Sequence, residues 1–251
     1  MKTWQWIVFV LISYLVFLIA YFPASYVAAQ IHAQTNQQVN LMQVTGTLFN
    51  GKAAAIEANG FRVNNIEWSL NPLSLLLLNA EVSLKGGAIR DSEQIYVDGE
   101  ASVNLLSVDS FSLTDTQIFV PAKAVLSQFK LPVAVTANGR FRVNIDQLEM
   151  TPTCTLLQGT GAWLNAEVDT PQQAVNLGSF NADLSCQEGD LTVSINEGNN
   201  LQLTGLIVVD STGKYSINGQ FLPNDELPSV IRRAADSFFQ RNGQGFYQIR
   251  L

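Results

Sequence analysis

The stretch ANGRFRVNI, from Ala137 to Ile145, decides the fold, because apolar and polar residues alternate along it. Single polar residues separate Phe141, Val143 and Ile145. This is the period of a β-strand with one buried and one solvent-facing side. An Asn-Gly pair flanked by alternating residues also predicts a two-residue hairpin turn at Asn138-Gly139. The stretch therefore predicts an antiparallel sheet with one wet face.

The same alternation continues through most of the chain beyond residue 40. ANGFRVN, Ala58 to Asn64, is a near-copy of the opening stretch that lacks Arg140. The alternation changes phase between Val63 and Ile66, which predicts a bulge or a short turn at Asn64-Asn65. The positions predicted to face the core are Phe61, Val63, Ile66, Trp68, Leu84, Phe141, Val143, Ile145, Leu191, Val193 and Ile195.

Three short helices are predicted between the strands. Asn71 can cap a helix that begins at Pro72, and Pro121 begins a second helix that reaches Phe129. The third runs from Leu227 to Phe239, where apolar residues are spaced by three and four. Each helix is short and has one apolar stripe, so we expect it to cover a sheet edge or the end of a barrel.

An uncharged N-terminal segment, Trp4 to Phe22, is long enough to cross a membrane. At 1.5 Å per residue, about 19 residues span the hydrocarbon core of roughly 30 Å. Lys2 precedes the segment and no Lys or Arg follows before Lys52, which places the N-terminus in the cytoplasm. The alternative is a cleavable signal peptide with Val27-Ala28-Ala29 as its cleavage site. We favour an anchor, because a signal core has only about 7 to 15 apolar residues.

The predicted organisation is a cytoplasmic N-terminus (residues 1–3), a transmembrane helix (4–22), a linker (23–40) and a periplasmic β domain (41–251). The expected fold class is mainly β: a single N-terminal transmembrane helix followed by a curved antiparallel β-sheet or open barrel with a few short helices. His32 lies in the polar linker without a nearby Cys, Asp or Glu, so we interpret it as a linker residue.

Two cysteines, Cys154 and Cys186, predict one disulfide if the domain is exported to an oxidising compartment. Two buried thiols are the alternative if the predicted topology is wrong. A metal site would need further ligands, which one distant histidine does not supply. We therefore expect no metal and no cofactor.

Charge and motifs argue against two large functional classes. The net charge of −7 repels phosphate backbones, so nucleic-acid binding is not expected. The chain lacks a phosphate-binding P-loop, a G-x-S-x-G motif and an H-E-x-x-H motif, so we predict that it is not an enzyme. Arg62 and Arg142 hold matching places in the near-repeat and are candidates to bind an anionic headgroup or a partner's carboxylate. We favour the simpler interpretation that both face solvent on a strand.

Two phrases resemble a known family. VTGTLFNG, Val44 to Gly51, places an aromatic residue between two glycines, and IEWSLNPLSLLL, Ile66 to Leu77, follows it. Together they resemble the opening periplasmic motifs of the type II secretion system protein N family. Later features are similar to that family in the same order: Cys154, GTGAWLNAEV (159–168), LGSFNADLSC (177–186) and a Gly-x-Tyr-x-Ile strand (245–249).

The resemblance implies an accessory subunit of the machinery that exports folded proteins across the outer membrane of Gram-negative bacteria. Such a subunit would lie in the inner membrane beside other secretion subunits, and the resemblance implies no catalytic residues. Phe49 stands where the family often has Trp, and we expect it either to contact a partner or to plug the end of the β core. The phrase Trp68 to Leu76 also resembles AsmA-like envelope proteins, so the alternative function is a periplasmic groove that binds or transfers lipid.

Overall fold

The computed structural model describes residues 3–36, 38–128, 136–170 and 173–250. Residues 1–2 of the predicted cytoplasmic N-terminus and Phe129, the predicted end of the second helix, lie outside the described residues. The helices are α1 (Thr3–Ala20), α2 (Ala24–Gln34), α3 (Pro72–Leu76), α4 (Ala122–Leu126) and α5 (Ser229–Phe238). The strands are β1 (Val39–Met42), β2 (Thr45–Gly46), β3 (Asn50–Ala58), β4 (Phe61–Leu70), β5 (Asn79–Gly86), β6 (Tyr96–Asn104), β7 (Ser107–Pro121), β8 (Thr136–Met150), β9 (Cys154–Asp169), β10 (Ala174–Gln187), β11 (Asp190–Ile195), β12 (Thr204–Val209), β13 (Tyr215–Phe221) and β14 (Tyr247–Arg250).

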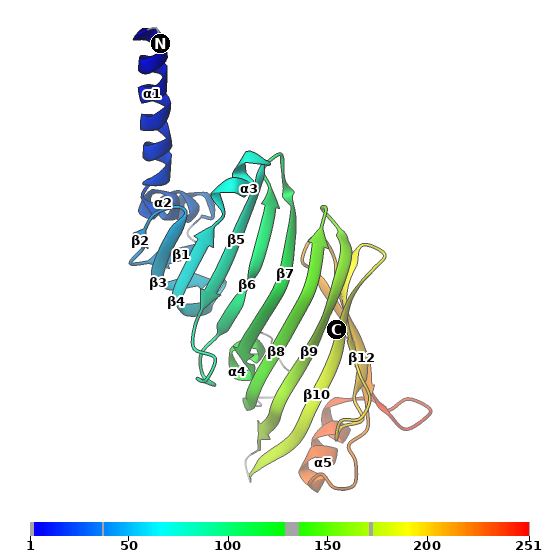
Figure 1. Ribbon diagram of the computed structural model, residues 1–251. Coiled ribbons are helices and arrows are strands. Elements are labelled where there is room, and N and C mark those ends of the chain that lie inside the picture. The colour runs from blue at the N-terminus through cyan, green and yellow to red at the C-terminus, as the bar shows by residue number, and fades with distance from the viewer. Residues whose placement is uncertain (1–2, 37, 129–135, 171–172, 251) are drawn as a thin grey trace.

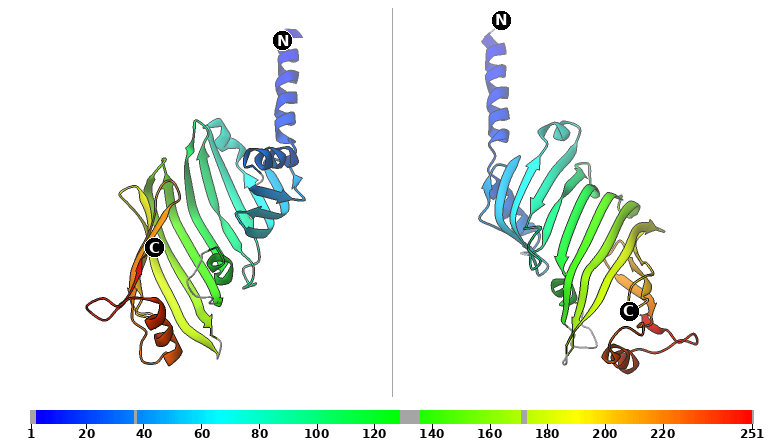
Figure 2. Two further views of the ribbon diagram at one scale, coloured as in Figure 1. Left: turned by 180° about the vertical axis from the view of Figure 1, so that it is seen from behind. Right: turned by 60° about the horizontal axis from the view of Figure 1, so that its bottom comes forward.

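All the described strands belong to one 14-stranded antiparallel sheet. Its order is β1-β3-β4 and then sequential to β14, while β2 pairs only with β3. Figure 1 shows a strongly curved sheet with α1 projecting from one end, and Figure 2 shows α4 and α5 on the same side of it. Among the described strands β1 and β14 do not pair, so the predicted alternatives of curved sheet or open barrel resolve to an open sheet.

One face of the sheet is apolar, as the alternation predicts. The register places six positions opposite one another in a row across β8 to β13: Ile145, Gly159, Leu184, Val193, Ile207 and Ile217. Of the eleven positions predicted to face the core, Ile66 and Ile145 are buried and the other nine are half-buried. The sheet therefore has an apolar face that the rest of the chain covers only in part.

Short helices provide the cover. α2 lies over the first strands. α5 packs Val230 and Ile231 against a cluster that contains Phe180, and Leu227, just before the helix, packs there too. The predicted helices are confirmed as α3, α4 and α5, and the Asn71 side chain accepts a hydrogen bond from the backbone N–H of Leu73. The segment predicted as a linker contains α2, because its apolar residues recur at helical spacing: Ala24, Val27, Ala28 and Ile31.

The two near-repeats fold differently. Asn59 and Gly60 form the predicted kind of turn, with φ values of 50° and 80° between the paired residues Ala58 and Phe61. The hairpin predicted at Asn138-Gly139 is wrong, because both residues lie inside β8 and Asn138 pairs with Glu167 of β9. The register shifts there, and Gly139 adopts a φ of 94°. Val133 to Val135, before that pair, lie outside the described residues.

The irregularity predicted at Asn64-Asn65 is confirmed. Asn65 has a φ of 51° inside β4. A methyl group on Gly86 would approach both Ile66 and Val63, at 2.2 Å and 3.1 Å. These two side chains therefore lie on one face although they are three residues apart, which explains the change of phase in the sequence.

The C-terminal end of α1 is tied to the sheet. Pro23 forms a β-bridge with Thr47, and the N–H of Leu48 donates to the carbonyl of Phe22 over 2.9 Å. Within the part of the chain that the structure describes, no helix combines the length and the apolar character of a membrane span. The N-terminal anchor stays a prediction.

Candidate docking surfaces

Phe49 lies in the bend between β2 and β3, close to the end of α1. It is half-buried, and its carbonyl accepts a hydrogen bond of 2.7 Å from Leu70. The flanking glycines serve contacts within the chain. A Cβ on Gly51 would lie 2.1 Å from the ring of Trp68, and one on Gly46 would lie 2.5 Å from the carbonyl oxygen of Asn50. Phe49 thus sits in a tightly packed corner with part of its ring accessible.

Trp68 organises this corner. Its indole N–H donates to the carbonyl of Leu48 over 3.1 Å, which joins the β2–β3 bend to β4. The ring also lines an apolar cavity of about 240 Å³ between α2 and the sheet, together with Ile31 and Ile66. The cavity is part of the apolar face and can hold a small hydrophobic group.

The opposite face of β3 to β6 carries paired charges. Lys52 contacts Glu67 at 2.6 Å and Lys85 contacts Asp98 at 2.8 Å. The hydrogen bond from Lys85 lowers the pKa of Asp98, and the same bond raises the pKa of Lys85. Burial raises the pKa of Tyr96, whose hydroxyl also donates to Asp98. Both charge pairs line an open groove of about 540 Å³, in which each charge has an opposite neighbour.

Arg62 and Arg142, matched in sequence, have different surroundings. The guanidinium of Arg62 contacts Glu57 at 2.9 Å and donates to the side chain of Asn64. Its charge is therefore already paired within the sheet. Arg142 is half-buried on β8, opposite Phe119 and Ala162, and its side chain has no ion pair or hydrogen bond to any described residue. Of the two, Arg142 is the better candidate to meet a partner's carboxylate.

Arg140 is the arginine that sequence reasoning passed over. Its guanidinium donates to the carbonyls of Ile89 and Gln94 at 2.8 Å and 3.2 Å and lies 4.6 Å from the ring centre of Phe119. Burial lowers its pKa. The only signal in the sequence was that Arg140 is the residue inserted into the near-repeat. It attaches the β5–β6 connection to β8 and has a structural role.

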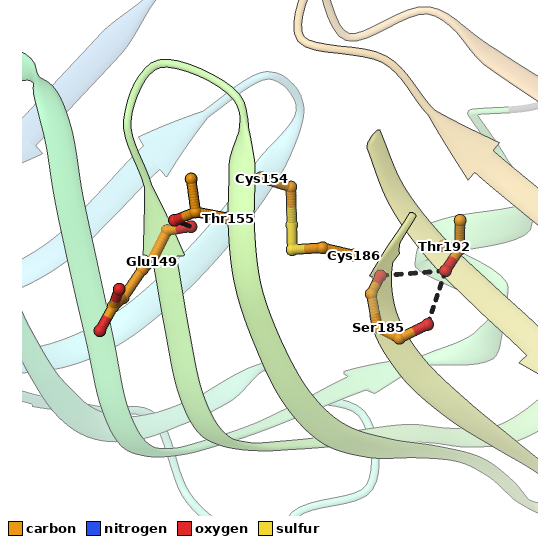
Figure 3. The surroundings of a disulfide bond; sticks show 6 residues. All are labelled: Glu149, Cys154, Thr155, Ser185, Cys186 and Thr192. Atoms are coloured by element: carbon orange, nitrogen blue, oxygen red, sulfur yellow. Dashed lines mark hydrogen bonds between the residues drawn. A yellow bond between two sulfur atoms is a disulfide. The ribbon is translucent and has the colours of Figure 1, made fainter. Parts of the chain in front are cut away.

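The predicted disulfide is present. Cys154 at the start of β9 bonds to Cys186 near the end of β10, with Cα atoms 5.5 Å apart (Figure 3). Cys154 belongs to a buried cluster with Ile145, Leu148 and Leu157. The N–H of Cys154 also donates to the carbonyl of Gly189. The bond therefore joins the ends of β9 and β10 at the apolar core.

An aromatic stack lies on the apolar face. Trp163 is 5.4 Å from Phe141 on β8 and 5.4 Å from Phe180 on β10, measured between ring centres. Its indole N–H donates to the carbonyl of Asn138 over 3.0 Å. The stack spans three neighbouring strands and packs against the cluster that α5 covers. This part of the apolar face is occupied from within the chain.

The described residues contain no group of three His, Cys, Asp or Glu side chains that could hold a metal ion. The Nδ1 atom of His32 lies 3.2 Å from the carbonyl oxygen of Val39 and links α2 to β1. The features best suited to function are therefore surfaces: the corner around Phe49, the cation of Arg142 and the half-covered apolar face.

Residues 37–250 match the model of the family described as type II secretion system (T2SS), protein N. A relative named type II secretion system protein N from Aeromonas hydrophila is 29% identical over 244 residues, covering 96% of this chain and 94% of that protein. One of the same name from Vibrio cholerae is 27% identical and covers 83% and 82%. A third, from Klebsiella pneumoniae, is 22% identical and covers 92% and 88%. No solved structure matches the chain.

Proposed function

The chain belongs to the type II secretion system protein N family, and from this premise we propose that it is a non-enzymatic, inner-membrane accessory subunit that acts as a periplasmic scaffold or docking protein. In this proposal α1 anchors the chain and the sheet contacts other inner-membrane subunits of the secretion machinery. The observation that carries the proposal is the family match, which covers nearly the whole sheet.

The surface of α1 supports the anchor. Its large apolar side chains are exposed along the helix, among them Trp6, Phe9 and Phe17, and no charged residue interrupts them. A contiguous apolar surface of this size is unfavourable in water at about 25 cal/mol per Å². A bilayer provides the apolar surroundings that such a helix needs.

Two features of the sheet support docking. β1 and β14 are its edges, and edge strands leave backbone N–H and C=O groups available to another chain. Arg142 offers a cation that no described residue pairs. An anchored subunit does not need tight contacts, because confinement at a membrane raises the effective concentration of its neighbours.

The half-covered apolar face favours the second candidate function, a groove that binds or transfers lipid. Nine of the eleven positions predicted to face the core stay half-buried, and α2 and α5 lie over only parts of that face. Exposed apolar area of this kind has to meet a lipid or a partner.

Site-specific photocrosslinking in living cells tests the proposal. A photoreactive residue is placed at position 49, 62 or 142, with Thr212 in the exposed β12–β13 turn as control. We expect adducts to inner-membrane secretion subunits from Phe49 and Arg142 and none from Thr212. Phospholipid adducts without protein adducts would instead support the groove, and equal protein adducts from Thr212 would contradict specific docking.

A further inference from the structure

Six exposed leucines form a surface that neither proposed function uses. They are 45% to 80% accessible to solvent. We call them the leucine patch: Leu73, Leu76, Leu77, Leu78, Leu105 and Leu106. The first four lie on or directly after α3, and the last two form the turn between β6 and β7. The N–H of Leu105 donates to the carbonyl of Leu78 over 2.9 Å, so the two segments are joined.

The local structure holds these leucines outward. Ser74, the polar residue of α3, is buried, whereas Leu73 and Leu76 of the same helix are exposed. Its hydroxyl donates to the carbonyl of Asn71 over 2.8 Å and accepts from the N–H of Glu81 over 3.2 Å. A short helix that buries its serine and exposes two of its three leucines is the reverse of the usual pattern. The hydrogen bonds of Ser74 therefore fix the orientation in which the leucines of the patch are exposed.

The topology places the patch at the same end of the sheet as the end of α1. Successive strands are antiparallel, so the β2–β3 bend, α3 and the β6–β7 turn all lie at one end. The β2–β3 bend is where Thr47 and Leu48 hold the end of α1. Figure 1 shows α3 and the β6–β7 turn at this end of the sheet.

Composition indicates what meets the patch. No charged residue occurs from Asn71 to Ala80 or from Ala101 to Val108. The patch contains no Trp, Tyr or Arg, which are enriched among the binding hot spots of protein interfaces, whereas leucine is under-represented among those hot spots. Aliphatic side chains at the same end of the sheet as α1 match the acyl boundary of a bilayer.

We propose that the leucine patch is a second membrane contact, whose leucines enter the phospholipid bilayer beside α1. The inference rests on the proposed anchoring by α1 and adds a second attachment point at the other side of the sheet end. One helix leaves a domain free to tilt and rotate, whereas two separated contacts define its orientation. The sheet edges and Arg142 are then presented at a defined height above the membrane.

Lipid quenching of a fluorophore tests this on the full chain. Both native cysteines are in the disulfide, so an introduced cysteine can be labelled alone. The purified chain is reconstituted in vesicles of phosphatidylethanolamine and phosphatidylglycerol that contain a doxyl-labelled lipid. The labelled variants are Leu106→Cys in the patch, Leu11→Cys on α1 and Ile89→Cys. Ile89 is the matched control, since it is a 46% exposed apolar residue in the β5–β6 connection at the opposite end of the sheet.

We expect quenching at position 106 to exceed that at position 89 by about threefold or more, as for groups that enter the bilayer by roughly 5–10 Å. Equal quenching at 106 and 89 with strong quenching at 11 would overturn the leucine contact and leave the anchor intact. Absence of quenching at all three positions would overturn both the contact and the anchor. Quenching at 106 without quenching at 11 would show that the patch binds lipid but that α1 does not.

Discussion

The indole ring of Trp68 occupies the space that a side chain at Gly51 would need. A Cβ built on Gly51 would lie 2.1 Å from Cζ2 of that ring, well inside van der Waals contact. The same indole donates its N–H to the carbonyl of Leu48. The aromatic residue of one family-like phrase therefore packs on a glycine of the other, and together they hold the bend to which the end of α1 is tied.

We predict that Gly51→Ala destabilises the domain. The added methyl group must displace the ring of Trp68, and overpacking of this kind costs about 1–3 kcal/mol. The measurement is the free energy of unfolding from urea titration, and the control is Gly243→Ala. A Cβ at Gly243 meets no atom within 4 Å. A Gly51→Ala variant as stable as Gly243→Ala would show that Trp68 is free to move.

The disulfide gives a second prediction. Cys154 and Cys186 are 32 residues apart, and a loop of that size restricts the unfolded chain by about 3–4 kcal/mol. We expect the Cys154→Ala/Cys186→Ala variant to lose up to that amount in urea unfolding. A reducing agent should destabilise the wild type and leave the double variant unchanged. Equal sensitivity of both proteins to the reductant would contradict this explanation.

The sequence predicted most strands and three helices, because their periodic patterns involve residues that are close in the chain. It predicted the disulfide because the chain has two cysteines. The hairpin at Asn138-Gly139 shows the limit. Asn59-Gly60 has the same two residues and does form a turn. At Gly139 pairing with β9 decides the outcome, since the carbonyl oxygens of Leu164 and Asn165 would lie 2.4 Å and 2.5 Å from a Cβ there. A contact with a strand formed later in the chain is not visible in the dipeptide.

The surfaces were harder to predict than the strands. Arg62 and Arg142 looked equivalent, because the near-repeat shows their neighbours along the chain and not across the sheet. Glu57 lies opposite Arg62 on the neighbouring strand and forms an ion pair with it, whereas no described residue forms an ion pair with Arg142. The leucines from Leu75 to Leu78 were expected to cover a sheet edge, yet Leu76, Leu77 and Leu78 are exposed. α3 turns Ser74 toward the sheet, so that its exposed leucines face away from it. This orientation depends on the contact of Ser74 with Glu81 of β5, which the local sequence does not show.

Tyr247 and Asp236 predict a pH dependence. The buried hydroxyl of Tyr247 donates to Asp236, which also pairs with Arg241. The hydrogen bond from Tyr247 is the largest cause that lowers the pKa of Asp236. Because the pKa of Asp236 is lower in the fold than its ordinary value of 3.8, the ionised carboxylate stabilises the fold when the pH is above that value. This stabilisation is lost as the pH falls through the lowered pKa. We expect Asp236→Asn to flatten the loss of stability in acid, as measured by urea unfolding between about pH 6 and pH 3.

Tyr247→Phe gives the matched measurement at the other end of the scale. Burial raises the pKa of Tyr247, so its contribution is present below pH 10 and is lost as the pH rises further. Removal of the hydroxyl should lower the free energy of unfolding by about 0.5–1.5 kcal/mol at neutral pH. It should also reduce the loss of stability that follows as the pH rises above 10. The double variant with Asp236→Asn should show less than the sum of the two effects. Simple additivity would mean that the two groups are not coupled.

Arg140 and Arg142, two residues apart on β8, separate structural from docking roles. Arg140→Ala removes two hydrogen bonds from a partly buried cation and should cost about 1–3 kcal/mol in urea unfolding. Arg142→Ala removes no ion pair or side-chain hydrogen bond to a described residue and should change stability by less than about 0.5 kcal/mol. If Arg142 meets a partner, its loss should still reduce export of a secreted protein by about fivefold, the effect of about 1 kcal/mol of binding. Normal export by Arg142→Ala would exclude this residue from docking, whereas a fall in both export and stability would give it the structural role of Arg140.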